Sequence, residues 1–345
     1  MKTKAMLGIA RELFDAEGNF DFPGPGLKLI DEIPEIDYRI FSEKHPEIAA
    51  EQVRGCDMVI SAATRWTEHS LEGNDQLVAV LFTGVGYDHI DVEALTKANT
   101  ILCFAPDAVR RPMACTIIAL TLAVAMRLVN KDRITRQGRW ADQRQYRGEG
   151  LTGKTFGSIG VGNIGREMFT LAKPFGMRHL GYDPHLSPED LADLGVELVD
   201  MDTLLAESDF VSISVPLRAE THHLVGGREF AKMKQSAYLI STSRGPIVDE
   251  KALIHALERG QIRGAALDVF EQEPVDPDNP LLKMDNVVVT PHSLCHTDEY
   301  YKTAWSGKIR QAHQIARGEI PDNVVNKEVL EKPEFLAKLA RFKNP

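Results

Sequence analysis

The sequence is poor in cysteine, with four in 345 residues, and no two of them show a CxxC spacing. A disulfide framework is therefore not expected, and no Cys/His cluster has the spacing of zinc ligands. We accordingly predict no metal site and expect reduced, packed thiols. The four positions are Cys56, Cys103, Cys115 and Cys295.

Basic charge is also in deficit, since 40 Lys and Arg face 50 Asp and Glu, for a formal net charge of -10. Proteins that bind nucleic acid usually present a basic face, and anionic membranes attract basic surfaces, so neither partner is expected. The longest apolar run, residues 114–126, is broken by threonines and is shorter than the roughly 20 residues that span a bilayer. The N-terminal stretch does not read as a signal peptide, so we expect a cytoplasmic protein.

What the chain does have is an ordinary globular composition, 43% hydrophobic and 26% charged, and enough length for about two domains. Short apolar runs rich in β-branched residues recur with helical patterns between them, which predicts parallel strands buried on both faces. Five such runs lie in the first third of the chain: Ala5–Ala10, Ile36–Phe41, Met58–Ala63, Val78–Thr83 and Thr100–Ala105. Six follow: Thr155–Val161, Arg178–Asp183, Phe210–Val215, Ala237–Ser241, Gly264–Phe270 and Asn286–Thr290. This alternation predicts an α/β fold with two doubly wound parallel sheets.

The domain boundary is predicted near two prolines, Pro106 and Pro112, which are expected to bracket a break before an apolar helix over residues 113–129. A second long helical pattern, over residues 298–317, follows the last predicted strand. These two helices can carry the chain from one domain to the other, which makes the first domain discontinuous. The predicted domains are residues 1–109 plus 298–345 for the first and residues 110–297 for the second.

A glycine-rich loop follows the first strand of the second set. It reads Gly160-Val161-Gly162-Asn163-Ile164-Gly165, with a helical pattern after it and Asp183 at the end of the next strand. In this context Gly160 permits a tight turn, Gly162 lets the backbone approach a pyrophosphate, and Gly165 allows close helix–strand packing. The helix N-terminus, with Asn163 and Ile164, faces the anion. A glycine-rich turn without a ligand is the alternative.

Asp183 bears on which dinucleotide binds. Its carboxylate is suited to accept hydrogen bonds from the adenosine ribose hydroxyls and to repel a 2′-phosphate. The sequence therefore predicts NAD as the cofactor in preference to NADP. A solvated acid at a strand end is the alternative for this residue taken alone.

Polar residues also follow three later strands of the second set: Arg244, Glu273 and His292. Ligands of open α/β sheets bind beyond the carboxyl ends of the strands, so we expect these three side chains to meet. Arg244 can hold a carboxylate and polarise a carbonyl. His292 can exchange a proton with a substrate oxygen, and Glu273 can fix the tautomer of the imidazole and favour the imidazolium. Taken singly, they can instead be an ion-pair partner, a loop acid and a turn histidine.

Together these motifs resemble the NAD-dependent D-isomer-specific 2-hydroxyacid dehydrogenase family over nearly the whole chain. Further resembling segments are GVGYDHID at residues 84–91, LTGKT at 151–155, SDF at 208–210 and VPL at 215–217. The resemblance implies a flavodoxin-like substrate domain and a Rossmann NAD-binding domain. It also implies reversible hydride transfer between NADH and a 2-oxo acid. Such a series of motifs is specific for the family and only weakly specific for a substrate.

The resemblance implies roles for the polar residues as well. Arg244 is expected to bind the substrate carboxylate and polarise the carbonyl, with Glu273 and His292 as the acid/base pair. Backbone amides around Val85 and Gly86 are expected to contact the same carboxylate.

Further implied roles concern the cofactor. Asp268 is expected to orient the nicotinamide carboxamide, with Pro216 and Thr242 lining the cofactor. One segment departs from the family pattern, because residues 107–116 carry Thr116 where members commonly have a glutamate at the start of the interdomain helix. Substrate and cofactor contacts of that segment are therefore not carried over.

The substrate stays open between small acids, such as glyoxylate or hydroxypyruvate, and a larger polar acid such as a sugar acid. Arg65, beside a tryptophan in the loop after the third strand, can meet a distal hydroxyl, carboxylate or phosphate, or it can be an ordinary surface arginine. The long loop of residues 11–26 can face the cleft too, with Phe14, Phe20 and Phe22.

Two rival functions use the same fold. A non-catalytic, corepressor-like NAD(H) sensor would bind NADH without turning over 2-oxo acids. A formate-type dehydrogenase would pair the histidine with a glutamine, so Glu273 argues against it. The family also implies a homodimer, for which residues 131–150, rich in arginine and aromatic residues, can supply an arm or can be a solvated loop.

Overall fold

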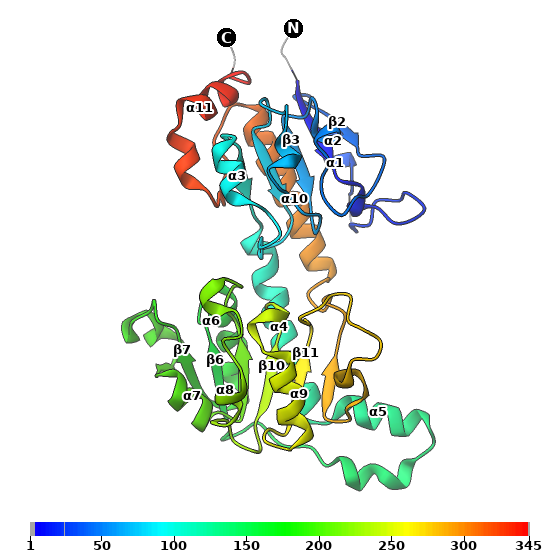
Figure 1. Cartoon of the computed structure of the whole chain (residues 1–345), viewed down its shortest axis with the longest axis vertical. Helices are drawn as coiled ribbons and strands as arrows, with labels where there is room; N and C mark the ends of the chain where they lie inside the picture. The colour runs from blue at the N-terminus through cyan, green and yellow to red at the C-terminus, as the bar shows by residue number, and fades with distance from the viewer. Residues whose placement is uncertain (1–3, 24, 344–345) are drawn as a thin grey trace. The chain divides into compact units, whose positions relative to one another are not determined.

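The computed structural model describes residues 4–23 and 25–343 of the chain, which fall into two compact units (Figure 1). Unit 1 holds the described residues up to Val109 and those from Thr297 onward, and unit 2 is Arg110–His296. The second boundary lies one residue before the predicted position, at the start of a helix. There the Thr297 side chain accepts a hydrogen bond from the Tyr300 amide and caps the helix.

Unit 1 is built on a five-stranded parallel sheet in the order β2-β1-β3-β4-β5, which is the flavodoxin-like order. Its strands are β1 (Ala5–Ile9), β2 (Ile36–Ile40), β3 (Met58–Ser61), β4 (Ala79–Phe82) and β5 (Ile101–Cys103). Its helices are α1 (Lys28–Asp31), α2 (Ala50–Val53), α3 (Val92–Lys97), α10 (Asp298–Ala316) and α11 (Pro333–Ala340). All five predicted strand runs are present. The β3 and β4 side chains are fully buried, as expected for strands covered on both faces.

Unit 2 is built on a seven-stranded parallel sheet in the order β12-β11-β10-β9-β6-β7-β8, the Rossmann order extended by one strand. Its strands are β6 (Thr155–Ile159), β7 (Arg178–Tyr182), β8 (Val196–Leu198), β9 (Phe210–Ile213), β10 (Tyr238–Ser241), β11 (Gly264–Leu267) and β12 (Val287–Val289). Its helices are α5 (Leu128–Arg136), α6 (Asn163–Ala172), α7 (Met201–Glu207), α8 (Gly227–Phe230), α9 (Glu250–Glu258) and most of α4 (Pro106–Ala125).

One strand of unit 2 was missing from the sequence prediction. It is β8, at the end of the sheet, with three residues of which only Val196 is buried. An edge strand with one covered side carries no apolar run, which explains why the pattern search passed over it.

Two apolar layers cover the faces of the seven-stranded sheet. One cluster joins sheet residues to α4 and α6, and the other joins them to α7, α8 and α9. Neighbouring residues of one strand enter different clusters, as with Leu239 and Ile240 of β10. This alternation is the reason that the strands read as continuous apolar runs.

The predicted break between Pro106 and Pro112 is wrong, because α4 starts at Pro106 and runs without interruption through Pro112 to Ala125. Proline fits the first helical turn, where an N–H has no intrahelical acceptor. Pro112 removes one interior hydrogen bond without ending the helix. The helix also ends earlier than predicted, because Arg127 has a left-handed backbone (φ 54°) before α5 begins.

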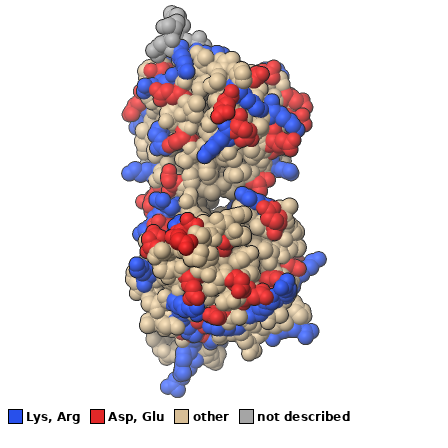
Figure 2. Space-filling model, turned by 90° about the vertical axis from the view of Figure 1, so that its left-hand side faces the viewer, with Lys and Arg blue, Asp and Glu red and all other residues tan. Residues whose placement is uncertain are grey.

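Among the described residues, α4 is the one helix long and apolar enough to cross a bilayer by those criteria alone. Of its most apolar window, 61% is buried in the protein, which is the pattern of a core helix. Charge of both signs is mixed over the face shown in Figure 2, where Lys and Arg alternate with Asp and Glu.

Candidate functional site

The carboxyl edge of the seven-stranded sheet carries the predicted cofactor and catalytic residues. The strand order places β10, β11 and β12 side by side, and these strands lead into Arg244, Glu273 and His292. The neighbours β9, β6 and β7 lead into Pro216, the glycine loop and Asp183. Residue types that lie far apart in the sequence therefore share one edge because parallel strands end on the same side.

The glycine loop joins β6 to α6 with a geometry that needs glycine. Gly160 has φ +90°, and a Cβ there would lie 2.6 Å from the Ser214 carbonyl oxygen. A Cβ on Gly165 would lie 2.8 Å from the Gly160 carbonyl oxygen, so α6 packs tightly against the turn. Gly162 is the N-cap of α6, and a Cβ there would meet nothing within 4 Å. Open space at this one glycine leaves room for a ligand against the helix N-terminus.

Asp183 is bound to the same loop. Its carboxylate accepts a hydrogen bond from the Val161 amide at 3.0 Å and another from the His185 amide at 3.0 Å. The acid is thus held where β7 ends, next to the glycine turn, while Asn163 and Ile164 begin α6.

Asp268 is fully buried just after β11, which is unusual for a carboxylate. One oxygen accepts hydrogen bonds from the Thr290 hydroxyl (2.7 Å) and the Ser293 amide (3.1 Å). The other oxygen has no hydrogen-bond partner in the part of the chain that the structure describes. Thr242 is buried at the end of β10, and Pro216 is exposed after β9. A buried acceptor without a donor is typical of a position that a ligand completes.

Glu273 and His292 form a direct pair, with Glu273 Oε2 and His292 Nδ1 2.7 Å apart and both side chains 37% exposed. The other carboxylate oxygen, Oε1, accepts from the Phe270 amide at 2.9 Å. Partial burial alone would raise the pKa of Glu273. The hydrogen bonds from His292 and Phe270 and the charges of His292 and Arg244 outweigh it, so the net pKa is lowered.

His292 occupies a strained backbone conformation, with φ 52°, which non-glycine residues seldom adopt. Arg244 begins the turn after β10, and its Nη1 donates to the Ser243 carbonyl at 2.8 Å. The next residue, Gly245, lies directly against the loop after β11, since a Cβ there would lie 1.8 Å from the Phe270 carbonyl oxygen. This close approach holds the Arg244 and Glu273 loops together. The glycine was not singled out by sequence reasoning, because the contact is between distant backbones.

The predicted substrate residues Val85, Gly86 and Arg65 belong to unit 1. Val85 and Gly86 lie in the loop after β4, which is fixed at its start by a hydrogen bond from the Ala105 amide to the Gly84 carbonyl (2.8 Å). Arg65 lies after β3 with an exposed side chain, and its carbonyl accepts from the Ile48 amide at 2.9 Å.

The loop after β1 carries Phe14, Phe20 and Phe22, the aromatic residues that can face a cleft according to the sequence. The rings pack on one another and on α10: Phe20 lies 5.5 Å from Phe22 and 4.5 Å from Trp305 between ring centroids. Phe14 in turn packs edge-on against Phe20 at 5.4 Å. Trp305 is buried and donates to the Gly26 carbonyl at 2.8 Å, which closes the loop at its far end. Aromatic side chains have a large apolar surface, so their burial against a helix is favoured over their exposure to water.

Thr116, the departure from the family pattern, is buried in α4 and its hydroxyl donates to the Pro112 carbonyl at 3.1 Å. The hydroxyl of Thr116 is therefore hydrogen-bonded within the helix. Elsewhere, residues 4–23 and 25–343 contain no group of three or more Cys, His, Asp or Glu able to hold a metal ion.

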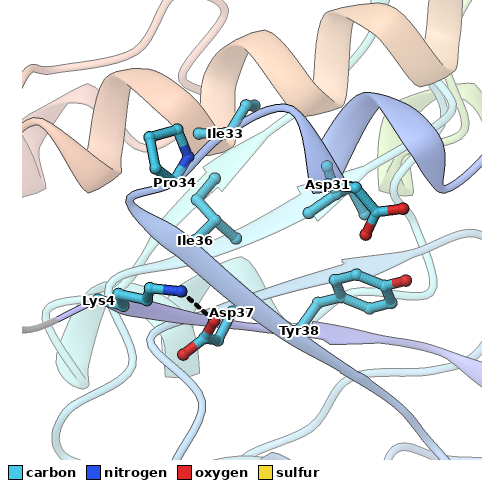
Figure 3. Close-up of a pocket in the computed structure, with 8 residues that line it drawn as sticks. Lys4, Asp31, Ile33, Pro34, Ile36, Asp37 and Tyr38 are labelled. Carbon is cyan, nitrogen blue, oxygen red and sulfur yellow. Dashed lines mark hydrogen bonds and ion pairs between the residues drawn. The ribbon is translucent and has the colours of Figure 1, made fainter.

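A hollow of about 360 Å³ in unit 1 lies apart from the residues singled out above (Figure 3). It is lined by Ile33, Ile36 and Tyr38 and spanned by an ion pair between Lys4 and Asp37 at 2.8 Å. Its residues precede β1 and β2 or belong to the first half of β2, near the amino ends of these strands. The residues that ligands of such sheets contact lie at the opposite ends.

The fold and the site together indicate a class of protein. A Rossmann strand order with an arginine, a glutamate and a histidine at its carboxyl edge is typical of nicotinamide-dependent oxidoreductases. The sequence profile of the D-isomer specific 2-hydroxyacid dehydrogenase NAD binding domain matches residues 118–293. A glyoxylate reductase of Korarchaeum cryptofilum is 39% identical over 90% of this chain and 95% of its own length. The chain belongs to the D-isomer specific 2-hydroxyacid dehydrogenase family.

Two further relatives fill in the comparison. A D-3-phosphoglycerate dehydrogenase of Methanocaldococcus jannaschii is 39% identical over 87% of this chain, but the chain spans only 57% of that relative's length. The crystal structure of D-lactate dehydrogenase from Aquifex aeolicus, complexed with NAD and lactic acid, superimposes with a TM-score of 0.79 at 26% identity, covering 91% of this chain and 96% of that one. The protein is an NAD-dependent dehydrogenase of this family, as predicted, and NAD is its cofactor.

The residues at the carboxyl edge of the seven-stranded sheet fit that cofactor. Gly162 leaves space at the N-terminus of α6, whose free amides and helix dipole suit a pyrophosphate. Asp183 is fixed beside the turn, and the buried Asp268 oxygen lacks a donor. These three features cover the anionic, ribose and carboxamide parts of a nicotinamide dinucleotide.

Proposed function

We propose that the protein catalyses the reversible reduction of a 2-oxo acid to a D-2-hydroxy acid. When bound, NADH supplies the hydride that the C2 carbonyl carbon receives. The carbonyl oxygen takes a proton at the same time, so the reaction consumes one proton and forms one alcohol. The chain has to bind the acid, polarise the carbonyl and deliver that proton.

The Glu273–His292 pair carries this proposal. Since Nδ1 of His292 is held by Glu273 at 2.7 Å, its Nε2 is the atom left to give a proton to the substrate oxygen. The lowered pKa of Glu273 keeps that carboxylate ionised at neutral pH, so it can accept the hydrogen bond from Nδ1 and fix the orientation of the imidazole ring. In the oxidation direction, the neutral imidazole takes the proton back.

Arg244 is proposed to bind the substrate carboxylate and to polarise the carbonyl. Its guanidinium lies close enough to Glu273 for its charge to help lower the pKa of that carboxyl. An arginine offers two parallel donors to a carboxylate, which fixes the orientation of the acid. Amides of Val85 and Gly86 are proposed to bind the same carboxylate.

The cofactor contacts are proposed along the rest of the edge. The loop Gly160–Gly165 and the first residues of α6 hold the pyrophosphate, and Asp183 binds the ribose hydroxyls. Asp268 orients the carboxamide, with Pro216 and Thr242 lining the nicotinamide side. The Asp183 carboxylate is held beside the glycine turn by the Val161 and His185 amides, and its negative charge would repel a 2′-phosphate, which supports the preference for NAD over NADP.

For the substrate we propose a short 2-oxo acid, glyoxylate or hydroxypyruvate. Support comes from the glyoxylate reductase that this chain matches almost from end to end, whereas the phosphoglycerate dehydrogenase is much longer. A larger sugar acid is the second candidate, because Arg65 presents an exposed cation on the edge that holds Val85 and Gly86.

The test is NADH oxidation, followed by absorbance, against glyoxylate, hydroxypyruvate, pyruvate, branched 2-oxo acids and 2-keto sugar acids, with NADPH in parallel. We expect turnover of the short acids, its loss in Arg244→Ala and His292→Ala, and slower turnover with NADPH. Tight NADH binding without turnover of any acid would overturn the proposal in favour of an NAD(H) sensor.

We also infer a homodimer formed through α5 and the 3₁₀ segment Trp140–Tyr146. This region exposes large apolar side chains to solvent, including Leu128 (59%), Val129 (49%) and Trp140 (69%). Exposed apolar side chains gathered on one projecting segment are typical of a protein–protein contact. Sedimentation velocity should give a dimer for the parent chain and a monomer for Leu128→Glu combined with Trp140→Glu, and a parent chain that sediments as a monomer would contradict the inference.

A further inference from the structure

Three loops leave the carboxyl ends of neighbouring strands in unit 1, and the carboxylate of Glu12 connects the first two of them. The sheet order puts β1, β3 and β4 side by side. Glu12 lies in a short 3₁₀ turn directly after β1. Its Oε1 accepts from the Ala62 amide at 2.6 Å and its Oε2 from the Ala63 amide at 3.0 Å, across 50 residues of sequence.

The loop after β3 is connected in turn to the loop after β4. Nε2 of His89 lies 3.0 Å from the Ala62 carbonyl oxygen, and because a carbonyl can only accept, the imidazole donates there. The backbones are paired as well: the Trp66 amide donates to the His89 carbonyl, and the Asp91 amide donates to the Trp66 carbonyl.

His89 follows Val85 and Gly86 by only a few residues. Residue Ala62 therefore carries both links, since its N–H donates to Glu12 and its C=O accepts from His89. Both hydrogen bonds that Glu12 accepts are charge-assisted, and such bonds are stronger than those between neutral groups. Loss of the carboxylate would leave two backbone donors to be satisfied by water and would free the peptide on which His89 rests.

We propose that Glu12 is a positioning residue for substrate binding, acting through Ala62 and His89 on the loop that carries Val85 and Gly86. The inference rests on the proposed function, in which the amides of that loop bind the substrate carboxylate. That contact is the same in the ground state and in the transition state. Its loss should therefore raise KM and leave kcat nearly unchanged.

The test is steady-state kinetics of Glu12→Gln in the full chain. The glutamine oxygen can accept from one amide, while its NH₂ group faces the other N–H, donor against donor. We expect KM for the best 2-oxo acid to rise about tenfold, kcat to change less than about threefold and the NADH dissociation constant to stay within about twofold. Glu17→Gln is the matched control, because this exposed glutamate lies in the same loop.

A second variant breaks the next link. His89→Phe keeps a ring against Phe82, whose centroid lies 5.2 Å away, but removes the donor to Ala62. It should reproduce the rise in KM with kcat preserved. An unchanged KM in both variants, or an equal fall of kcat and kcat/KM, would overturn the positioning role.

Hydrogen exchange separates this inference from the proposed reaction. In Glu12→Gln, amides of residues 62–65 and 84–90 should exchange faster than in the parent chain and in Glu17→Gln. If the parent chain turns over no 2-oxo acid, the proposed function fails, and exchange in these two segments still decides whether Glu12 orders them. Unchanged exchange there would exclude the ordering role.

Discussion

The two units use the same kind of sheet edge in different ways. In unit 2 the edge brings charged side chains together, with Arg244, Glu273 and His292 at the ends of three neighbouring strands. In unit 1 the edge is organised by backbone amides and carbonyls, which Glu12 and His89 tie together. The first arrangement is suited to proton transfer and charge stabilisation, whereas the second is suited to fixing the conformation of a binding loop.

This contrast predicts which kinetic constant a substitution moves. Changes at the charged edge remove interactions that strengthen in the transition state, so kcat falls. Changes at the backbone edge weaken contacts that are equally strong in the ground state and in the transition state, so KM rises while kcat stays nearly unchanged. Substitutions at the two edges therefore test that division, and the largest effect is expected at His292.

His292→Ala should cost the most. Acid/base catalysis contributes about 10²–10⁴-fold, which corresponds to roughly 3–5 kcal/mol of transition-state stabilisation. We expect the rate constant of the chemical step, measured in single turnovers, to fall by that factor, and kcat with it, while NADH binding stays unchanged. His223→Ala is the control, because His223 forms a similar pair with Glu271 (2.6 Å) that the proposed mechanism does not use. Equal losses in both variants would contradict the assignment of His292.

Lys308→Met tests a charge that is buried in unit 1 and that the proposed mechanism does not use. Lys308 is 1% exposed, its Nζ donates to the Gln311 side chain at 2.9 Å, and burial lowers its pKa from 10.5 to about 8. Below pH 8 the folded protein must hold a desolvated cation, which costs roughly 3 kcal/mol at 1.36 kcal/mol per pKa unit.

The sign of the pH effect follows from proton counts. Between pH 8 and pH 10.5 the unfolded state keeps the Lys308 proton that the folded state has lost, so the free energy of unfolding rises with pH. Lys308→Met should be the more stable protein near neutral pH, and its advantage should shrink toward pH 10.5. Urea unfolding at several pH values measures this, with Lys302→Met of the same helix as the exposed control. A difference independent of pH would contradict the prediction.

Most of this fold was predictable from the sequence, because strands buried on both faces leave continuous apolar runs. All the predicted runs became strands, while β8 escaped because only one of its three residues is buried. The start of α4 was predicted wrongly at Pro106 and Pro112. A proline does not end a helix where the packing of the helix compensates for the lost hydrogen bond.

The candidate site was predictable to the extent that it follows strand ends. Arg244, Glu273 and His292 come directly after apolar runs, so topology alone assembles them. The contacts of Glu12 were out of reach, because they join a side chain to amides 50 residues away. The close approach of Gly245 to Phe270 likewise needs coordinates, as does the positive φ of His292.

Gly162→Ala isolates cofactor binding from folding. An added Cβ would meet nothing within 4 Å in the protein itself, so stability should be nearly unchanged, but a pyrophosphate against the α6 N-terminus would collide with it. We expect the NADH dissociation constant to rise about tenfold or more, equivalent to about 1.4 kcal/mol, measured by fluorescence titration. Gly227→Ala, at another open helical glycine, is the control. Unchanged NADH affinity would argue against a pyrophosphate at this loop.

Arg65→Ala should have the smallest effect, and it is where the contrast between the edges is weakest, because here a charged side chain lies on the backbone edge. The side chain is exposed, so any ion pair with substrate is screened by water and is worth about 0.2–1 kcal/mol. With glyoxylate, which has no distal group, we expect no change in KM. With a 2-keto sugar acid, KM should rise about two- to fivefold as the contact is lost. Arg54→Ala, another exposed arginine of unit 1, should change neither constant. If Arg65→Ala leaves KM for the sugar acid unchanged, Arg65 is an ordinary surface residue, and recognition at this edge belongs to backbone groups alone.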